Sequence, residues 1–337
     1  MDFTSDATQT TVAEMVRGLL AREPDDLWAA LTDAGLCTML LPESAGGDGL
    51  GLPEAAAVLT ELAAAAAVGP ALATLGFGVV PLVALAEPEV LAAAVPAGAI
   101  LTAALAEPGA QFPAVPSTRA VLDGTTASIS GTKIAVPYAA QAHRILVPTD
   151  SGVVLVDPRV DGVSVHRTPS SSGDPEYTVD FVSAPGILVS TDVATLYRIS
   201  LSAIGAVADG LAAGAAALTA SHLAGRHQFG KPLATFQAVA GEIADVYVTA
   251  RTIHVAAVSA VWQTSSGSAA DDNDVLAYWI AAELPAAMQM CHHLHGGIGV
   301  DVTYPMHRYY SAAKDLARLV GGASYRLDLV GAACSSN

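Results

Sequence analysis

Apolar positions recur along this chain with two different periods. Up to about residue 105 they follow helical spacing, and alanine, which has the highest intrinsic helix propensity, is the dominant residue. Asp6 and the run Pro24-Asp25-Asp26 precede two of these segments as helix N-caps, and Pro53 lies in the first turn of a third. The pattern therefore predicts an N-terminal α-helical domain over residues 1–105.

Short runs of β-branched residues replace the helical pattern over residues 107–189. Turn residues separate these runs, and Asp123-Gly124 and Asp161-Gly162 supply glycines that reach positive φ without strain. The predicted strands cover residues 127–129, 145–147, 153–156 and 178–182. These features predict a small middle β-sheet domain over residues 106–190.

Long helical stripes return after Ser190, and Phe236, Ile243 and Val246 mark one of them. The predicted helices cover residues 197–225, 234–264, 275–295 and 305–320, with Gly321-Gly322 closing the last clear helix. Because these helices are apolar nearly all round, we expect a C-terminal four-helix bundle over residues 191–337 that also packs against other subunits. The predicted fold class is α+β, mainly α.

One uncharged stretch, residues 62–86, is long enough to span a bilayer. It is mostly alanine, and glycines and prolines interrupt it at Gly69, Pro70, Gly76, Gly78 and Pro81. The interruptions favour two short buried helices, so we expect no membrane partner.

Composition and charge exclude some classes of function. The 337 residues include 52% hydrophobic and only 14% charged residues, and the mean hydropathy is +0.47. So little charge predicts that partner subunits cover part of the surface. A net charge of −17 disfavours nucleic acid as a partner, and an anionic ligand such as a CoA ester would need local positive charge.

Cysteine usage and the first residues indicate the compartment. Cys37, Cys291 and Cys334 contain no CxxC pair and are odd in number, which argues against a disulfide framework or a zinc ribbon. The start is acidic and lacks an apolar core, so we expect no signal peptide. A reducing cytoplasm is the expected location.

The densest motif in the chain is the run from Gly225 to Gln237, Gly-Arg-His-Gln-Phe-Gly-Lys-Pro-Leu-Ala-Thr-Phe-Gln. It resembles the RxQFGxPLxxFQ signature of acyl-CoA dehydrogenases, which joins two long C-terminal helices. Four further segments are similar to motifs of that family: residues 28–51 to GLxxLxVPExxGGxGLG, 106–109 to TEPxxGSD, 130–133 to NGxKxWITNA, and 295–310 to GGxGYxxxYPVERYY. The resemblance therefore extends over nearly the whole chain.

The resemblance implies FAD as cofactor and an acyl-CoA thioester as substrate. In the family a glutamate removes the α-proton while the flavin accepts the β-hydride. The residues that reach a neighbouring subunit's FAD are retained here: Arg226 for the pyrophosphate, Phe229 and Gln237 beside the adenosine half, and His293, Gly296 and Gly297 at the dinucleotide turn. Core packing and a loop hydrogen bond are the structural alternatives for Phe229 and Gln237.

The rest of the family's catalytic apparatus is missing. Gly321 occupies the position of the usual base glutamate, and Tyr197 occupies the alternative base position. Ala135 and Pro137 replace the tryptophan and threonine that face the flavin ring, and residues 111–113 replace the family's Gly-Ser-Asp. No catalytic residue is therefore assigned to this chain.

Two other groups of residues are candidates for binding. His292, His293 and His295 could suggest a metal, but no cysteine pair or carboxylate completes a ligand set, so we expect no metal. In the β domain, Arg159, His166 and Arg167 could meet CoA phosphates, although a solvated face is the favoured interpretation.

Three hypotheses follow. The first is a degenerate subunit that completes the shared FAD site of a second, catalytic acyl-CoA dehydrogenase subunit, as in the actinobacterial two-plus-two heterotetramers that oxidise steroid side-chain CoA thioesters in cholesterol catabolism. The second is a homomeric dehydrogenase with a displaced base, with Glu242, Glu283 or Asp315 as candidates. The third is a scaffold without redox chemistry, against which the retained Arg226 argues.

Overall fold

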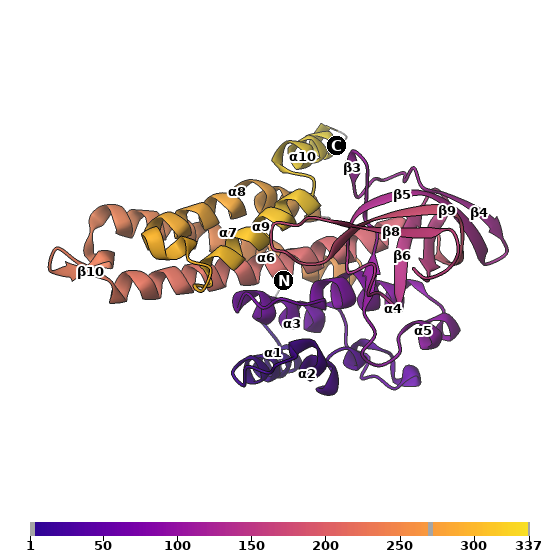
Figure 1. Ribbon diagram of the computed structural model, residues 1–337, viewed down its shortest axis with the longest axis horizontal. Coiled ribbons are helices and arrows are strands. Elements are labelled where there is room, and N and C mark those ends of the chain that lie inside the picture. Colours follow the sequence, from indigo (N-terminus) through magenta and orange to yellow (C-terminus); the bar gives the residue numbers. More distant parts are fainter. Residues whose placement is uncertain (1–3, 269–271, 336–337) are drawn as a thin grey trace. The chain divides into compact units, whose positions relative to one another are not determined.

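The computed structural model describes residues 4–268 and 272–335, and this part of the chain forms two compact units (Figure 1). The first unit comprises Ser5–Val58 and Val68–Ala203, which contain the N-terminal helices and the large sheet. The second contains Leu59–Ala67 and the long helices that follow residue 204. Helices α3 and α6 each contribute residues to both units.

The N-terminal helices begin where their capping residues predict. Helix α1 (Ala7–Leu20) has a capping box, in which Asp6 Oδ1 accepts from the Gln9 N–H at 2.8 Å and the Gln9 side chain accepts from the Asp6 N–H at 3.2 Å. Asp26 caps α2 (Leu27–Asp33) through the Ala29 N–H at 3.0 Å. Two 3-10 turns, η1 (Thr38–Leu40) and η2 (Glu43–Ala45), then lead to α3 (Leu52–Ala64).

The uncharged stretch folds into short buried elements, as predicted. It contains the end of α3, the π-helix η3 (Leu72–Val79) and α4 (Val80–Leu85), and α5 (Pro88–Ala94) follows. In η3 a Cβ on Gly78 would collide with Leu101, so glycine is what permits this close approach. Helix α6 (Val193–Gly225) is the one helix in the described part that is long and apolar enough to cross a membrane, but 67% of its most apolar window is buried in the protein. Burial of this extent is typical of a core helix.

The large sheet contains nine strands in the order β1-β6-β7-β9-β5-β2-β3, with β4 added on β5 and β8 on β9. Apart from the parallel pair β1–β6, all pairs are antiparallel. The strands are β1 (Leu101–Ala103), β2 (Ala106–Glu107), β3 (Ala110–Gln111), β4 (Arg119–Asp123), β5 (Thr126–Pro137), β6 (Arg144–Thr149), β7 (Gly152–Val156), β8 (Val163–Thr168) and β9 (Glu176–Ser190). The predicted Asp123-Gly124 turn joins β4 to β5, with Gly124 at φ +61°.

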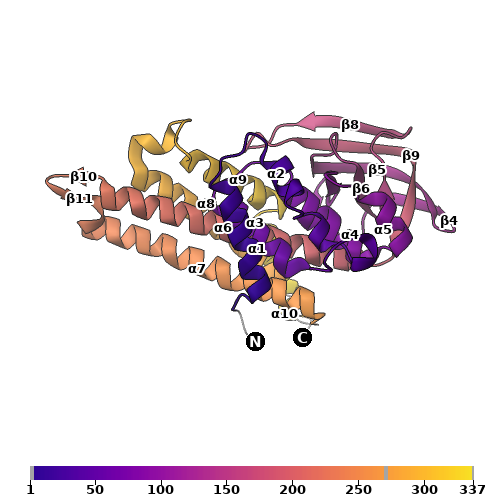
Figure 2. The same ribbon diagram turned by 90° about the horizontal axis from the view of Figure 1, so that it is seen from below.

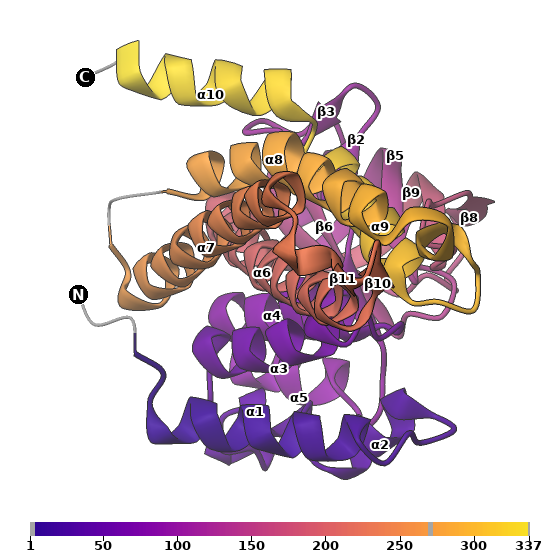
Figure 3. The ribbon, with the colours of Figure 1, turned by 90° about the vertical axis from the view of Figure 1, so that its left-hand side faces the viewer.

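The long helices of the second unit run side by side (Figures 1 and 2). After α6 come a small hairpin, β10 (His227–Gln228) and β11 (Lys231–Pro232), and the 3-10 turn η4 (Leu233–Thr235). They are followed by α7 (Gln237–Ser266), α8 (Asn273–His295), η5 (Gly296–Val300), α9 (Met306–Leu319) and α10 (Ala323–Ser335). The hairpin lies at one end of these helices, the end that faces the viewer in Figure 3.

Helix α10 corrects the sequence-based prediction that α9 is the last clear helix. The Gly321-Gly322 pair does end α9, but the chain turns there and continues as a helix. Arg326 of α10 is 1% exposed, donates to Asp274 Oδ1 at 2.6 Å and donates through Nε to the Val320 carbonyl at 2.6 Å. A buried arginine is not visible as an apolar stripe, which is why the pattern of hydrophobic positions missed this helix.

The predicted fold class is confirmed, because the chain is helical at both ends and has a sheet in the middle. The domain boundaries 1–105, 106–190 and 191–337 stay a prediction.

Candidate functional site

Arg226 lines a cavity of about 310 Å³ in the second unit, directly after the last residue of α6. Its N–H donates to the His222 carbonyl at 2.8 Å and its carbonyl accepts from the Leu233 N–H at 2.8 Å, so the turn that carries it is fixed at both ends. The cavity walls are Leu218, Ser221, His222, Gly225, Arg226 and Tyr304. None of these six residues is acidic, which gives an otherwise acidic chain a local site for an anion.

Two stacked imidazole rings stand at this cavity. The ring centroids of His222 and His295 are 4.6 Å apart at an angle of 24°, and the Tyr304 ring lies 5.3 Å from His295. His295 is 5% exposed, and its Nδ1 lies 2.7 Å from the Cys291 carbonyl, which can only accept, so Nδ1 carries the proton. Its Nε2 is buried with no hydrogen-bond partner in the described part of the chain.

Burial is the main cause of the electrostatic perturbation of both histidines. It lowers the pKa of His222, and the neighbouring His295 and Arg226 lower it further. Burial also lowers the pKa of His295, against a smaller opposite effect of its bond to Cys291. Both rings are therefore biased toward the neutral form.

Phe229 lies at the tip of the β10–β11 hairpin and is 92% exposed. Its backbone has φ +52°, a region that L-residues seldom adopt, and its ring stands 6.3 Å from that of Phe236. Lys231 Nζ lies 4.2 Å from the centroid of the Phe236 ring, which holds the base of the hairpin. Core packing within this chain therefore does not explain Phe229.

The other retained residues are also at the surface of this end of the helices. Gln237 is exposed as the first residue of α7, and the side chain of His293 is 72% exposed, with Nε2 3.9 Å from Glu242 Oε2. Gly296 has φ +63° and ψ −143°, which only glycine adopts readily, whereas a Cβ on Gly297 would meet nothing within 4 Å. The packing of this chain therefore does not explain the glycine at 297.

Sequence analysis missed two residues of this site. His222 and Tyr304 line the cavity, but among the six lining residues Arg226 alone was predicted to bind the cofactor. The spacing could have revealed His222, because it precedes Arg226 by one helical turn and residues four apart share a helix face. Tyr304 comes from the segment before α9 and only the fold brings it to α6.

Gly321, the residue that sequence analysis places at the usual base position, has a backbone and surroundings that disfavour a side chain. Gly321 lies in the turn between α9 and α10 with φ +97°, and a Cβ there would approach Tyr325 Cδ1 to 2.5 Å. Both the backbone angle and the tyrosine ring therefore exclude a glutamate in this arrangement. At position 321 the backbone conformation, as well as the residue type, is therefore unfavourable for a glutamate.

The alternative base position is filled by an aromatic pair in the first unit. Tyr197 of α6 is 8% exposed and packs edge to face with Phe112, with centroids 5.3 Å apart and planes at 75°. Phe112 belongs to the segment that replaces the family's Gly-Ser-Asp. Two residues at which the sequence differs from the family motifs, Phe112 and Tyr197, thus pack against each other.

The three candidate displaced bases have ordinary surroundings. Glu242 is near His293, and Asp315 Oδ1 lies 3.5 Å from Arg318 Nη2. Glu283 is half-buried on α8. None of the three lines the cavity at Arg226.

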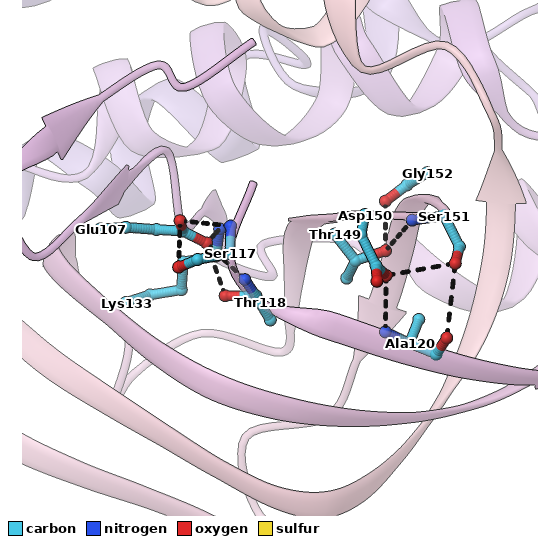
Figure 4. Close-up of polar contacts among 9 residues, drawn as sticks. All are labelled: Glu107, Ser117, Thr118, Ala120, Lys133, Thr149, Asp150, Ser151 and Gly152. Carbon is cyan, nitrogen blue, oxygen red and sulfur yellow. Dashed lines mark hydrogen bonds and ion pairs between the residues drawn. The ribbon is translucent and has the colours of Figure 1, made fainter. Parts of the chain in front are cut away.

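A buried ion pair joins two of the recognised motifs in the first unit (Figure 4). Lys133 Nζ lies 2.7 Å from Glu107 Oε1, and the two side chains are 0% and 3% exposed. Glu107 also accepts from the N–H and hydroxyl groups of Ser117 (2.7 and 2.6 Å) and Thr118 (2.9 and 2.6 Å). A Cβ on Gly131 would lie 2.8 Å from Thr118 Oγ1, so the glycine of the NGxK-like motif makes room for this network.

The flavin-side substitutions lie just beyond this network on β5. Ala135 has φ +53°, and an irregularity in the β5–β9 ladder falls between Lys133 and Val136. Ala135 and Pro137 are both half-buried. Lys133 thus anchors β5 through the ion pair, and the two residues that sequence analysis places at the flavin-facing positions, Ala135 and Pro137, have no aromatic or hydroxyl group.

The remaining candidate groups bind neighbours within the chain. His293 is exposed toward Glu242 while His295 is buried against His222, and the described residues contain no cluster of three metal-ligating side chains. In the β region, Arg159 pairs with Asp157 at 2.7 Å. His166 Nε2 lies 3.7 Å from Asp180 Oδ2, and Arg167 donates to the Gly173 carbonyl at 3.2 Å.

The chain is helical at both ends with a sheet in between, and Arg226 lines a cavity at one end of the long helices. Residues 2–99 match the N-terminal domain of acyl-CoA dehydrogenases, and residues 186–333 match their C-terminal domain. The chain belongs to the acyl-CoA dehydrogenase family, a family of oxidoreductases.

One relative and two solved structures are similar to this chain over nearly its whole length. Acyl-CoA dehydrogenase FadE28 of Mycobacterium tuberculosis is 50% identical over 343 residues, covering 99% of each chain. The Tcur3481-Tcur3483 steroid ACAD (G363A variant) is 33% identical with a TM-score of 0.87, covering 98% of this chain and 97% of the other. The ChsE4-ChsE5 complex from Mycobacterium tuberculosis is 28% identical with a TM-score of 0.88, covering 100% of both.

Family members with this fold bind FAD. One of them, a glutaryl-CoA dehydrogenase from Mycobacterium smegmatis, has been solved with FADH2; it is 19% identical with a TM-score of 0.83, covering 99% of this chain and 96% of the other. The residues at the Arg226 end fit such a cofactor, because they offer a cation and a glycine turn with open space beside it.

Proposed function

We propose that this chain is the catalytically degenerate subunit of a heteromeric FAD-dependent acyl-CoA dehydrogenase, and that it completes the FAD site of a second, catalytic subunit. The observation that carries the proposal is a contrast within the chain. The end around Arg226 has a cavity without acidic lining residues and an exposed aromatic tip, whereas the backbone at Gly321 and the Tyr325 ring disfavour a side chain there.

The exposed hairpin supports assembly with a partner. A phenylalanine that is 92% exposed costs free energy in water, and its positive φ adds backbone strain. Both costs are offset if Phe229 packs against a neighbouring subunit or its cofactor. The low fraction of charged residues, 14%, agrees with a surface that is partly covered in an assembly.

The roles divide between the two subunits. FAD, when bound, accepts the hydride from the β-carbon of the acyl-CoA. In this chain Arg226 binds the pyrophosphate with a charge-assisted hydrogen bond, and Phe229 and Gln237 flank the adenosine half. His293, Gly296 and Gly297 form the turn that the dinucleotide approaches. The partner supplies the base and the flavin-facing side chains, because Gly321, Tyr197, Ala135 and Pro137 offer neither.

The substrate belongs to the partner's site and is an acyl-CoA thioester. The favoured substrate is the CoA thioester of a steroid side chain, because one similar structure is that of a steroid ACAD. Two of the similar structures, Tcur3481-Tcur3483 and the ChsE4-ChsE5 complex, contain two different proteins, which supports a heteromer. The form that we propose is a two-plus-two heterotetramer. The free, buried thiols of Cys37 and Cys291 agree with a reducing cytoplasm; the side chain of Cys334 lies outside the described residues.

Flavin content tests the proposal. The chain is purified alone and after co-expression with its catalytic partner, and the flavin absorption band is measured for each. We expect none alone and about one FAD per pair of chains together, and Arg226→Ala should strip FAD from the complex without unfolding this chain.

Two other outcomes would support the competing hypotheses. A full complement of flavin and activity in the isolated chain would indicate a homomeric dehydrogenase with a displaced base. No flavin in any preparation would support a scaffold of the same fold. Flavin content that Arg226→Ala leaves unchanged would refute the proposed role of this chain in the FAD site.

A further inference from the structure

The cavity at Arg226 contains a titratable group, His222, that the family motif of residues 225–237 does not include. His222 lies one turn before Arg226 on α6 and lines the same cavity. Its ring stacks on His295 at 4.6 Å, which fixes its orientation. We propose that His222 binds the FAD pyrophosphate together with Arg226 and makes FAD retention by the complex dependent on pH. This inference rests on the proposed function.

The groups around His222 explain why it would take up a proton only with the ligand. His295 faces it from α8, Arg226 from the end of α6 and Tyr304 from the segment before α9. No carboxylate is among the residues that line the cavity. Protonated His222 therefore faces only a cation and neutral rings until a pyrophosphate brings the first negative charge.

His295 is the poorer of the two proton acceptors. Its Nδ1–H already donates to the Cys291 carbonyl at 2.7 Å, so protonation would place a second N–H on Nε2. That nitrogen is buried and has no acceptor in the described part of the chain. A charged group without a hydrogen-bond partner in the interior costs free energy, so His295 stays neutral. Its ring orients His222 by stacking against it.

Protonation of His222 and binding of FAD should favour each other. A pyrophosphate close to His222 raises the pKa of its imidazole above the lowered value in the free chain. FAD binding therefore takes up a proton, and the affinity for FAD rises as the pH falls through the histidine range. A charge-assisted hydrogen bond of ordinary strength corresponds to about a tenfold lower Kd at about pH 5.5 than at about pH 8.

The test measures the FAD dissociation constant of the assembled complex against pH by equilibrium dialysis. We expect His222→Gln to bind weakly with no pH slope and His222→Lys, which keeps a charge that does not titrate here, to bind tightly with no slope. His166→Gln is the matched control, because it removes a histidine from the exposed strand β8 and should keep the wild-type slope. Proton uptake on FAD binding in weakly buffered solution, roughly one per FAD, should disappear in His222→Gln.

The outcomes separate this inference from the proposed function. Loss of FAD from Arg226→Ala together with a wild-type pH slope in His222→Gln would overturn the role of His222 and leave the proposed function intact. Retention of FAD by Arg226→Ala would overturn both. If the glutamine variant does not fold, the slope of His222→Lys decides the question, since a purely structural role predicts that the slope remains.

Discussion

The ion pair between Glu107 and Lys133 leads to a quantitative prediction about stability. Burial raises the pKa of the Glu107 carboxyl, but the hydrogen bonds from Lys133, Ser117 and Thr118 outweigh it and lower the pKa from 4.5 to about 2. Burial lowers the pKa of Lys133 to about 8, against the opposing effect of Glu107. Both groups are therefore charged at neutral pH.

The magnitude follows from this shift. A pKa lowered from 4.5 to about 2 corresponds to about 3 kcal/mol, and solvent screens the carboxylate little because its side chain is 3% exposed. Removal of one partner of a buried pair costs about 3–5 kcal/mol in general. We therefore expect Glu107→Gln to lower the free energy of unfolding by about 3 kcal/mol at neutral pH.

The pH dependence is a second part of the same prediction. Because the folded-state pKa lies below the unfolded one, the stabilisation is complete above about pH 4.5 and is lost as the pH falls toward about 2. The difference between wild type and Glu107→Gln should therefore shrink to about 1 kcal/mol near pH 3. Urea unfolding at several pH values, monitored by circular dichroism, measures it.

Asp157→Asn is the matched control. Asp157 pairs with Arg144 and Arg159 but is 25% exposed, so its loss should cost about 1 kcal/mol. The double variant Glu107→Gln/Lys133→Met should be more stable than Glu107→Gln, because it removes the uncompensated ammonium. The reasoning is refuted if Glu107→Gln costs no more than Asp157→Asn, or if its cost does not change with pH.

Two further predictions concern the degenerate site. Gly321→Glu introduces the residue type of the family's base but should give the isolated chain no dehydrogenase activity. It should lower the melting temperature, because φ is +97° and Tyr325 occupies the space. Activity in this variant would show that the turn rearranges. Phe229→Ser should change the melting temperature of the isolated chain little, since the ring is 92% exposed, but should lower the flavin content of the complex, and equal flavin in both proteins would exclude a cofactor role for Phe229.

Local signals determined much of the fold in advance. Asp6 and Asp26 cap their helices through the bonds that their short side chains allow, and glycine at 124 makes the β4–β5 turn. These features depend on residues a few positions apart, so the sequence displays them directly. Helix α10 was missed because its buried contact is the charged residue Arg326.

The sequence by itself determined the family, because a motif such as that of residues 225–237 is a property of the chain. It also led to the prediction that the base glutamate is missing. Only the tertiary structure decided what those residues contact. It brings Lys133 to Glu107 across 26 positions, stacks His222 on His295 from another helix, and places the Tyr325 ring where a side chain at 321 would stand. The physical reason is that burial, orphaned nitrogens and pKa shifts arise from neighbours distant in sequence, which a one-dimensional pattern does not contain.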